Sequence, residues 1–520
     1  MTQSGSPPSF SLASYDETPY IDLPFAQSHP GRLAVMARLF GMHPPDVATA
    51  RVLELGCAGG GNLIPMAVAM PDATFLGIDL SARQIADGQH VIAALGLENI
   101  ELHHADIAGV DADYGSFDYI VSHGIYSWVP APIREKLLSI CRDNLAPNGV
   151  AYVSYNARPG WAIRGILRDA MLYHARGAAS AAERIRRSRE ALDFLSQHLP
   201  ADTAYAAVLR QDLDGLAQVN DAYLSHDHLE DNNEAFYFHE FVDAAERHRL
   251  QYLAEADFSA MAPQIPRELK DTLRQVAPDL VAREQYLDFL HHRSFRQTLL
   301  VHDEATLERN LTPQSMQAFD IASTMQPESP SPVLAQGVNE SFRSASGSTI
   351  STASAISKAA LVELGRAWPR ALSFATLTER ARKRLRDAAA AGAVSLEDDT
   401  RTLGIDMLQC YAAGATELRL WSPALSVEPS PQPVASVLAR LQATRGAEVT
   451  NLLHKGVTLN PFGRALVPLL DGTRNRPLLI AALKAAMTAG TLALPSQERA
   501  LQRTLLETLS GLGKAALLTG

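Results

Sequence analysis

A glycine-rich turn near the N-terminus restricts the fold of this chain more than any other feature. Residues 52–55 are apolar or strand-forming, and the next residues read Gly56-Cys57-Ala58-Gly59-Gly60-Gly61-Asn62. Glycine lets a backbone turn tightly and lets a ligand approach without a Cβ in the way. The pattern predicts a strand, a ligand-binding turn and a helix, which together open an α/β sheet.

Short apolar runs alternate with helical patterns after this turn. The predicted strands are Arg51–Leu55, Thr74–Asp79, Ile100–His104, Phe117–Ser122 and Gly149–Tyr155, with helices such as Ala82–Leu95 and Ile133–Leu145 between them. Parallel strands joined by crossover helices predict a doubly wound, Rossmann-like sheet covered on both faces. Two later runs, Leu250–Ala254 and Phe295–His302, predict the last two strands of a seven-stranded sheet.

Composition divides the chain into four parts. An N-terminal leader or lid is expected over residues 1–50, and an α/β domain over 51–305 with a helical insertion at about 160–248. Residues 306–357 are predicted to be a linker region, because 326–357 are rich in Ser and Pro. A mainly helical (α+β) C-terminal region is expected over 358–520.

Charge and cysteine content exclude several classes of protein. The net charge of −11 argues against general nucleic-acid binding, which needs clustered Lys and Arg. The three cysteines argue against a disulfide framework and favour a reducing compartment. Neither an apolar signal segment nor a bilayer-spanning stretch is evident. We therefore expect a cytoplasmic protein with no stable membrane insertion and no nucleic-acid partner.

Three acidic residues are predicted at the ends of consecutive strands. Glu54 can lie near a cationic ligand, Asp79 can accept the two hydroxyls of a ribose, and Asp106 lies near the expected adenine edge. S-adenosyl-L-methionine carries an ammonium and a sulfonium and no phosphate, so these acids favour it as the cofactor. The alternative is a dinucleotide, because Gly56-x-Ala58-x-x-Gly61 nearly matches G-x-G-x-x-G.

The same residues resemble a known family. Glu54–Gly60, Gly77–Asp79 and Phe117–Val121 resemble class I S-adenosylmethionine-dependent methyltransferases. Four more specific segments resemble bacterial methyltransferases with a methyltransferase regulatory domain. They are Ser122–Pro130, Ser154–Trp161, Phe236–Phe241 and Phe295–Leu300. That group includes protein-lysine methyltransferases acting on outer-membrane proteins. The similarity runs from about Tyr15 to His302, and more loosely over Asn451–His454 and Pro461–Arg464.

The resemblance and the sheet together predict the site residues. The expected cofactor-binding residues are Glu54, Gly56, Cys57, Ala58, Gly59, Asn62, Asp79, Leu80, Asp106, Ile107 and His123. Ala58 departs from the glycine of many relatives, and we expect binding to survive this small change. The expected catalytic residues follow the fourth and fifth strands and are Tyr126, Trp128, Tyr155 and Asn156. Alternatively, Tyr126 and Trp128 pack beneath their loop.

Two other segments contain residues that could form sites. The leader residues Tyr15, Tyr20, His29 and Arg32 are expected to fold over the cofactor, as the leader does in the resembling family. His239-Glu240-Phe-Val-Asp243 is not H-E-x-x-H, so no metal is expected.

The resemblance implies N-methylation of lysine in a protein substrate. An outer-membrane protein before export is one candidate substrate, and a homodimer is one candidate assembly. Lysine must then lose its proton, which costs about 4 to 5 kcal/mol at pH 7, and Tyr126, Tyr155 and Asn156 could place oxygen atoms near the amine. The alternatives are a small-molecule methyltransferase and a non-catalytic cofactor-binding regulatory protein. A non-catalytic regulatory protein would be expected to have lost the glycine turn, which is intact here.

Overall fold

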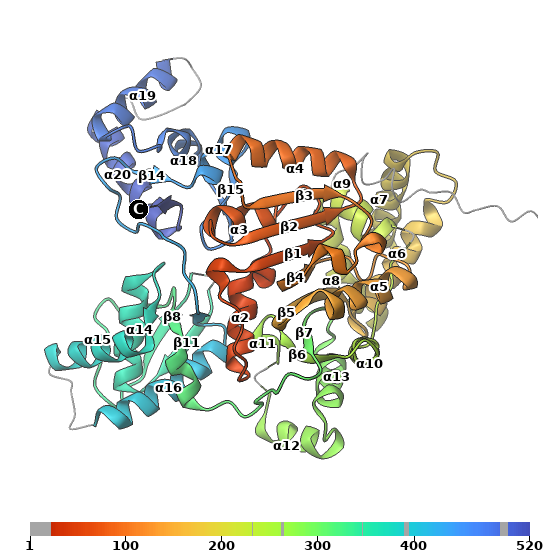
Figure 1. The fold of residues 1–520 in the computed structure, drawn as a ribbon, viewed down its shortest axis with the longest axis horizontal. Helices are drawn as coiled ribbons and strands as arrows, with labels where there is room; N and C mark the ends of the chain where they lie inside the picture. Colours follow the sequence, from red (N-terminus) through yellow and green to blue (C-terminus); the bar gives the residue numbers. More distant parts are fainter. Residues whose placement is uncertain are drawn as a thin grey trace, which may run out of the picture.

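The computed structural model describes residues 22–230, 232–261, 265–345, 347–388, 395–488 and 498–519. Figure 1 shows three parts: an α/β domain with its helical insertion, a middle unit drawn in green to cyan, and a C-terminal unit drawn in blue. The predicted lid residues Tyr15 and Tyr20 lie outside the described residues. None of the helices in the described ranges combines the length and hydropathy needed to cross a bilayer.

The α/β domain is built on one seven-stranded sheet with the strand order β3-β2-β1-β4-β5-β7-β6. The strands are β1 (Arg51–Leu55), β2 (Thr74–Asp79), β3 (Ile100–His104), β4 (Phe117–Ser122), β5 (Leu145–Asn156), β6 (Leu250–Glu255) and β7 (Phe295–His302). The first five strands are parallel, whereas β7 runs antiparallel to both β5 and β6. The predicted seven-stranded fold is therefore confirmed, with a mixed rather than an all-parallel sheet.

Helices cover both faces of this sheet and form two cores. One core joins β1 and β4 to α2 (Pro30–Leu39), α3 (Leu63–Ala69) and α4 (Ala82–Leu95). The other joins the same strands to α5 (Ala131–Asp143) and α10 (Phe238–Arg247). Along β4, Tyr119 and Val121 enter the first core and Ile120 the second, as expected because successive side chains point to opposite faces. Near-continuous apolar strands result from this two-sided burial.

The insertion after β5 is helical, as expected. Its helices are α6 (Gly160–His174), α7 (Ala181–His198), α8 (Ala204–Gln218) and α9 (Asp221–Leu224), followed by a π-helix at Ser225–Leu229. They enclose a separate small core that includes Leu167, Met171 and Leu209. The segment between β6 and β7 carries α11 (Phe258–Met261), α12 (Arg267–Val276) and α13 (Leu280–His291).

The stretch 306–357, for which composition indicated a linker, is instead folded into the middle unit. It contains β8 (Asp320–Ala322), β9 (Gln326–Pro327), β10 (Glu340–Arg343) and β11 (Thr349–Thr352). Ile321, Met325 and Phe342 are fully buried there, and the strand pairs satisfy the backbone polar groups. A few buried apolar side chains and paired strands thus fold a segment whose average composition is that of a loop.

The rest of the middle unit packs onto these short strands. Its elements are α14 (Ala355–Ala367), β12 (Leu372–Ser373), α15 (Phe374–Asp387), α16 (Leu396–Ala412) and β13 (Glu417–Arg419). The core of this unit is continuous with the α2 face of the large sheet, since Phe319, Ile321 and Leu361 share one apolar cluster with Leu33 and Met36. Helix α2 therefore lies between the sheet and the middle unit (Figure 1).

The C-terminal unit is a compact arrangement of helices around a hairpin. It comprises β14 (Val434–Ala435), α17 (Val437–Arg445), β15 (Glu448–Thr450), β16 (Gly456–Thr458), α18 (Pro461–Leu466), α19 (Arg476–Thr488), α20 (Glu498–Lys514) and β17 (Leu518–Thr519). It has its own apolar core, which includes Leu466, Leu479 and Leu505. Strands β15 and β16 pair antiparallel, and their connecting loop lies at the glycine turn of the large sheet.

Candidate functional site

The glycine turn after β1 has the geometry that its sequence predicts. Gly56 and Gly60 have φ angles of +77° and +79°, a region that favours glycine, and Ala58 tolerates a φ of +48°. The turn is also tightly covered, because a Cβ at Gly88 of α4 would clash with the carbonyl oxygen of Gly59. The glycines thus serve the turn itself and the close approach of the neighbouring helix.

Glu54 lies beneath this turn, and only one of its two carboxylate oxygens has a hydrogen-bond partner among the described residues. It is 2% exposed, and its Oε1 accepts a hydrogen bond of 2.8 Å from Nδ2 of Asn62. Its Oε2 is buried with no hydrogen-bond partner among the described residues. Burial raises the pKa of Glu54 to about 8 from its ordinary value of 4.5, despite the hydrogen bond from Asn62. An unpartnered buried carboxylate oxygen suits a cationic ligand group.

The other two predicted acids lie at the same edge of the sheet but differ in surroundings. Asp79 accepts hydrogen bonds from the backbone N–H groups of Ala58 (2.9 Å) and Ser81 (2.8 Å), which fixes its side chain beside the turn. Asp106 is exposed and accepts a hydrogen bond from the backbone N–H of Ala108. Leu80, directly after Asp79, is 43% exposed. The predicted cofactor residues are therefore brought to one edge of the sheet.

The described part of the leader covers the turn. The backbone N–H of Gly59 donates to Asp22 Oδ1 (3.2 Å), and the backbone N–H of Phe25 donates to Asn62 Oδ1 (2.9 Å). The Phe25 ring lies 3.8 Å from the ring of His123, centroid to centroid. Neither Asp22 nor Phe25 was predicted as a site residue, because a contact across 37 residues leaves no local pattern in the sequence.

His123 directly follows the fourth strand and lies among aromatic rings and hydroxyl groups. Its Nδ1 lies 2.9 Å from the hydroxyl of Tyr152 and 3.3 Å from Oγ of Ser154. Phe295, at the start of β7, lies 6.1 Å away, ring to ring. Burial lowers the pKa of His123 to about 4, so its imidazole is neutral at pH 7.

The four predicted catalytic residues are placed differently from one another. Tyr126 and Tyr155 are 3% and 1% exposed and pack among Phe236 and Phe241. The Tyr155 hydroxyl lies 3.2 Å from Oγ1 of Thr298. In this conformation both phenols are part of the core, so neither lies where an incoming substrate could touch it. Both rings belong to the apolar cluster that also contains Phe241 of helix α10.

Trp128 and Asn156 lie nearer to the loops. Trp128 is half-buried, with its ring edge-to-face against Trp161 of the insertion at 6.3 Å. Asn156 is 3% exposed, and its backbone N–H donates to Ser127 Oγ. The side-chain Nδ2 of Asn156 is buried and has no partner in the described part of the chain. Asn156 thus keeps free hydrogen-bonding capacity at the end of β5.

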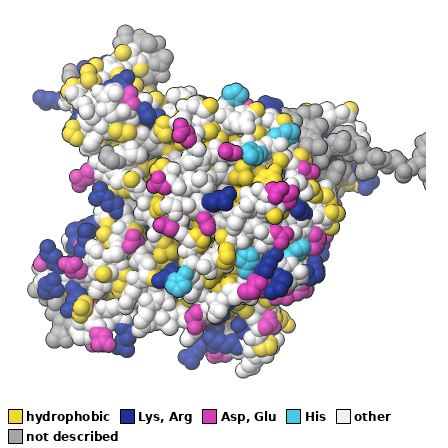
Figure 2. All heavy atoms as spheres, in the orientation of Figure 1, with side chains coloured by type: hydrophobic (Ala, Val, Ile, Leu, Met, Phe, Trp, Pro, Cys, Tyr) yellow, Lys and Arg dark blue, Asp and Glu magenta, His cyan; other side chains and the backbone are white. Residues whose placement is uncertain are grey.

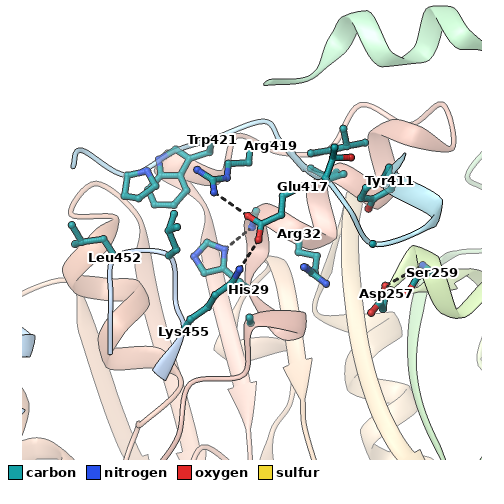
Figure 3. Close-up of a pocket in the computed structure, with 18 residues that line it drawn as sticks. His29, Arg32, Asp257, Ser259, Tyr411, Glu417, Arg419, Trp421, Leu452 and Lys455 are labelled. Atoms are coloured by element: carbon teal, nitrogen blue, oxygen red, sulfur yellow. Dashed lines mark hydrogen bonds and ion pairs between the residues drawn. The ribbon is translucent and has the colours of Figure 1, made fainter. Parts of the chain in front are cut away.

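A cavity of about 230 Å³ lies where the three parts of the molecule meet. Helix α2, strand β13 and the loop between β15 and β16 line it (Figure 3). In it, Glu417 forms ion pairs with Lys455 (2.5 Å) and Arg419 (2.9 Å). Burial opposes ionisation of Glu417, but these two cations outweigh it and lower its pKa to about 2. His29 forms part of the wall, stacked 5.7 Å from Trp421.

Within the described ranges, no group of three or more His, Cys, Asp or Glu side chains is placed to hold a metal ion.

Comparisons with known proteins agree with this architecture. Residues 52–149 match the family model described as "Methyltransferase domain", and 220–302 match "Predicted methyltransferase regulatory domain". Residues 431–517 match "PKMT, C-terminal winged helix domain". The last match corresponds to the C-terminal unit and identifies its β15–β16 hairpin as part of a winged-helix domain.

Relatives that match most of this chain are found in both sequence and structure. A protein of Rickettsia prowazekii (strain Madrid E), RP789, is 37% identical over 487 residues, covering 92% of this chain and 87% of the relative. The structure of PKMT2 from Rickettsia typhi in complex with AdoHcy, S-adenosylhomocysteine, is 29% identical with a TM-score of 0.87, covering 96% of this chain and 100% of that chain. A second structure of PKMT2 from Rickettsia typhi gives a TM-score of 0.86.

The agreement extends from the glycine turn to the last unit, and it establishes both the enzyme class and the cofactor. The chain is an S-adenosylmethionine-dependent methyltransferase, and the dinucleotide alternative is set aside. It belongs to the class I methyltransferases that carry a methyltransferase regulatory domain and a PKMT-type C-terminal winged-helix domain.

Proposed function

We propose that this enzyme transfers a methyl group to the side-chain nitrogen of lysine in a protein substrate. The observation that carries the proposal is the similarity to PKMT2 over nearly the whole chain, including the middle and C-terminal units. A second observation supports it: the molecular outline in Figure 2 is indented between the lobes formed by those two units. An open indentation suits a polypeptide better than a small molecule, which is typically enclosed.

The proposed cofactor site is the edge of the sheet at β1 to β4. Gly56, Ala58, Gly59 and the cysteine between them would face the cofactor with their backbone. The buried Oε2 of Glu54 would meet its ammonium group, Asp79 would accept its ribose hydroxyls, and Asp106 and Ile107 would flank its adenine. Leu80 offers an exposed apolar side chain beside Asp79. When bound, the cofactor supplies an electrophilic methyl group on a sulfonium.

The chemistry requires a lysine amine without its proton. Its nitrogen lone pair forms the new C–N bond while the C–S bond breaks, which leaves S-adenosylhomocysteine and a methylated ammonium that then loses a proton to solvent. Phe25, Phe295 and the neutral imidazole of His123 form an uncharged aromatic surface that would favour the uncharged amine. The unpartnered Nδ2 of Asn156 can only donate, so it could bind a carbonyl oxygen of the substrate and orient the peptide, leaving the amine lone pair free. Holding the two reactants together supplies most of the acceleration.

The test is methyl transfer itself. The full-length enzyme is incubated with isotopically labelled S-adenosylmethionine and purified bacterial outer-membrane proteins that have been unfolded, and modified residues are located by mass spectrometry. Label on lysine side chains is expected, and an Asp79→Ala variant, with weakened cofactor affinity, is the matched control. Proteins without label would count against the proposal and favour one of the two alternatives, a small-molecule methyltransferase or a non-catalytic regulatory protein.

A further inference from the structure

The hairpin of the C-terminal unit inserts a histidine into the cofactor turn. Residues 451–455 connect β15 and β16, and Nε2 of His454 lies 2.8 Å from Oδ1 of Asn62, although the two residues are 392 positions apart. His454 is only 4% exposed, and Asn62 is equally buried. Asn62 is also the partner of Glu54. The last unit of the chain therefore contacts the first, at the point where the cofactor is proposed to bind.

The surroundings of Asn62 decide which atom of His454 carries the proton. Nδ2 of Asn62 donates to Oγ of Ser28 (2.9 Å) and to Oε1 of Glu54 (2.8 Å), so the orientation of the amide is fixed. Its Oδ1 accepts from the backbone N–H of Phe25 (2.9 Å). Because a carbonyl oxygen can only accept, His454 must donate through Nε2–H. With this bond, Asn62 uses its full hydrogen-bonding capacity.

The imidazole of His454 is neutral. Burial, together with the nearby His29, holds the pKa of His454 well below its ordinary value of 6.5. The two rings lie 5.3 Å apart, and burial lowers the pKa of His29 to about 4 as well. His454 can thus support the Asn62–Glu54 pair without placing a positive charge beside a site that must accept a cationic cofactor.

The loop that carries His454 is held in shape by the C-terminal unit itself. Oδ1 of Asn451 accepts from the backbone N–H groups of Leu453 (3.0 Å) and Lys455 (2.9 Å). Nδ2 of Asn451 donates to the carbonyl of Ala515 (2.9 Å), and His454 has a left-handed φ of +59°. The donor is therefore positioned before it meets Asn62, which lowers the entropy lost when the contact forms.

We propose that His454 is a positioning residue for the cofactor site: the winged-helix hairpin fixes Asn62, and Asn62 orients the Glu54 carboxylate toward the cofactor. The C-terminal unit is then part of the methyl-donor site, because its hairpin contacts the α/β domain of the same molecule. This inference rests on the cofactor placement of the preceding section.

The test compares variants of the full-length protein by calorimetric binding of S-adenosylhomocysteine. His454→Leu removes the donor and keeps an apolar side chain. His454→Gln restores a donor, because its amide nitrogen is the same number of bonds from Cα as Nε2. His454→Asn places the amide at the position of Nδ1 and should not restore binding. Leu459→Ala, in the core of the same unit, is the matched control for general loss of stability.

We expect the Kd to rise about three- to tenfold in His454→Leu, the loss typical of one buried hydrogen bond, and to return to within about twofold of wild type in His454→Gln. KM for the methyl donor should rise while kcat stays within about twofold. Hydrogen exchange of the free protein should quicken at the amides of residues 56–62 in His454→Leu and not in His454→Gln.

Three results would overturn this inference. The first is equal affinity in His454→Leu and wild type. The second is equal loss in His454→Gln, His454→Asn and Leu459→Ala, since the histidine would then report only the stability of its unit. The third is an unchanged affinity in Asp79→Ala, which would remove the cofactor from this turn and the inference with it. A loss in Asp79→Ala alone would leave the proposed cofactor site intact and refute only the role of His454.

Discussion

The buried carboxyl group of Glu54 makes cofactor affinity depend on pH. Burial raises its pKa to about 8, so at pH 7 only about one-tenth of the free enzyme carries the ionised form. If the cofactor ammonium binds the carboxylate, ionising it first costs about 1.4 kcal/mol at pH 7, which is a tenfold loss of apparent affinity. Binding should therefore release close to one proton. Affinity should rise about tenfold per unit from pH 6 to pH 7 and level off above about pH 8.

The perturbation that isolates this effect is Glu54→Gln. Glutamine keeps an oxygen that can accept from Nδ2 of Asn62, and it cannot titrate. The ammonium of the cofactor itself titrates near pH 8, and that effect is common to both proteins. The informative quantity is hence the ratio of the wild-type and Glu54→Gln affinities at each pH.

The assay is isothermal calorimetry at pH 6, 7 and 8, repeated in buffers with different ionisation enthalpies so that proton release is measured directly. The free protein offers an independent check of the same pKa. A carboxyl whose pKa is raised by folding holds its proton in the folded state while the unfolded chain has lost it, between about pH 4.5 and 8. Relative to Glu54→Gln, wild-type unfolding free energy should fall by up to about 1.4 kcal/mol per unit through this window.

Parallel affinity profiles in wild type and Glu54→Gln, with no difference in proton release, would refute the reasoning. They would mean either that Glu54 is already ionised in the free enzyme or that the cofactor ammonium lies elsewhere. The stability curves separate these two causes, because only the first would also make them parallel.

Four further outcomes are expected. Asp79→Ala should weaken cofactor binding by about 1 to 3 kcal/mol, measured by calorimetry. Tyr155→Phe should leave turnover within about twofold and lower unfolding free energy by about 0.5 to 1.5 kcal/mol, since Thr298 is the hydrogen-bond partner of this hydroxyl among the described residues; a large loss of kcat would show that the hydroxyl takes part in catalysis. Arg296→Leu should cost about 3 to 5 kcal/mol in denaturant unfolding, because three buried carboxylates lose the cation that they share, while Arg293 still pairs with two of them. Phe194→Glu, at a 61% exposed position on the insertion, should weaken any self-association seen by sedimentation.

The sequence by itself determined the elements of the sheet and the cofactor turn. Six of the seven predicted strands agree with the structure to within a residue, and β5 contains the remaining one. This is so because apolar runs, crossover helices and glycine turns are local patterns, set by residues close together in the chain. The acids Glu54 and Asp79 could be placed for the same reason, since the ends of neighbouring parallel strands meet at one edge.

Tertiary structure alone decided the rest. The direction of β7, the folding of the Ser- and Pro-rich stretch 306–357 and the burial of Tyr155 depend on which surfaces pack together. The periodicity of apolar residues predicts which side chains share a face of a helix or strand, but it does not predict which element packs against that face. The hydrogen bond between His454 and Asn62 is the extreme case: it joins residues 392 positions apart, and it exists because the C-terminal unit docks where β1 ends.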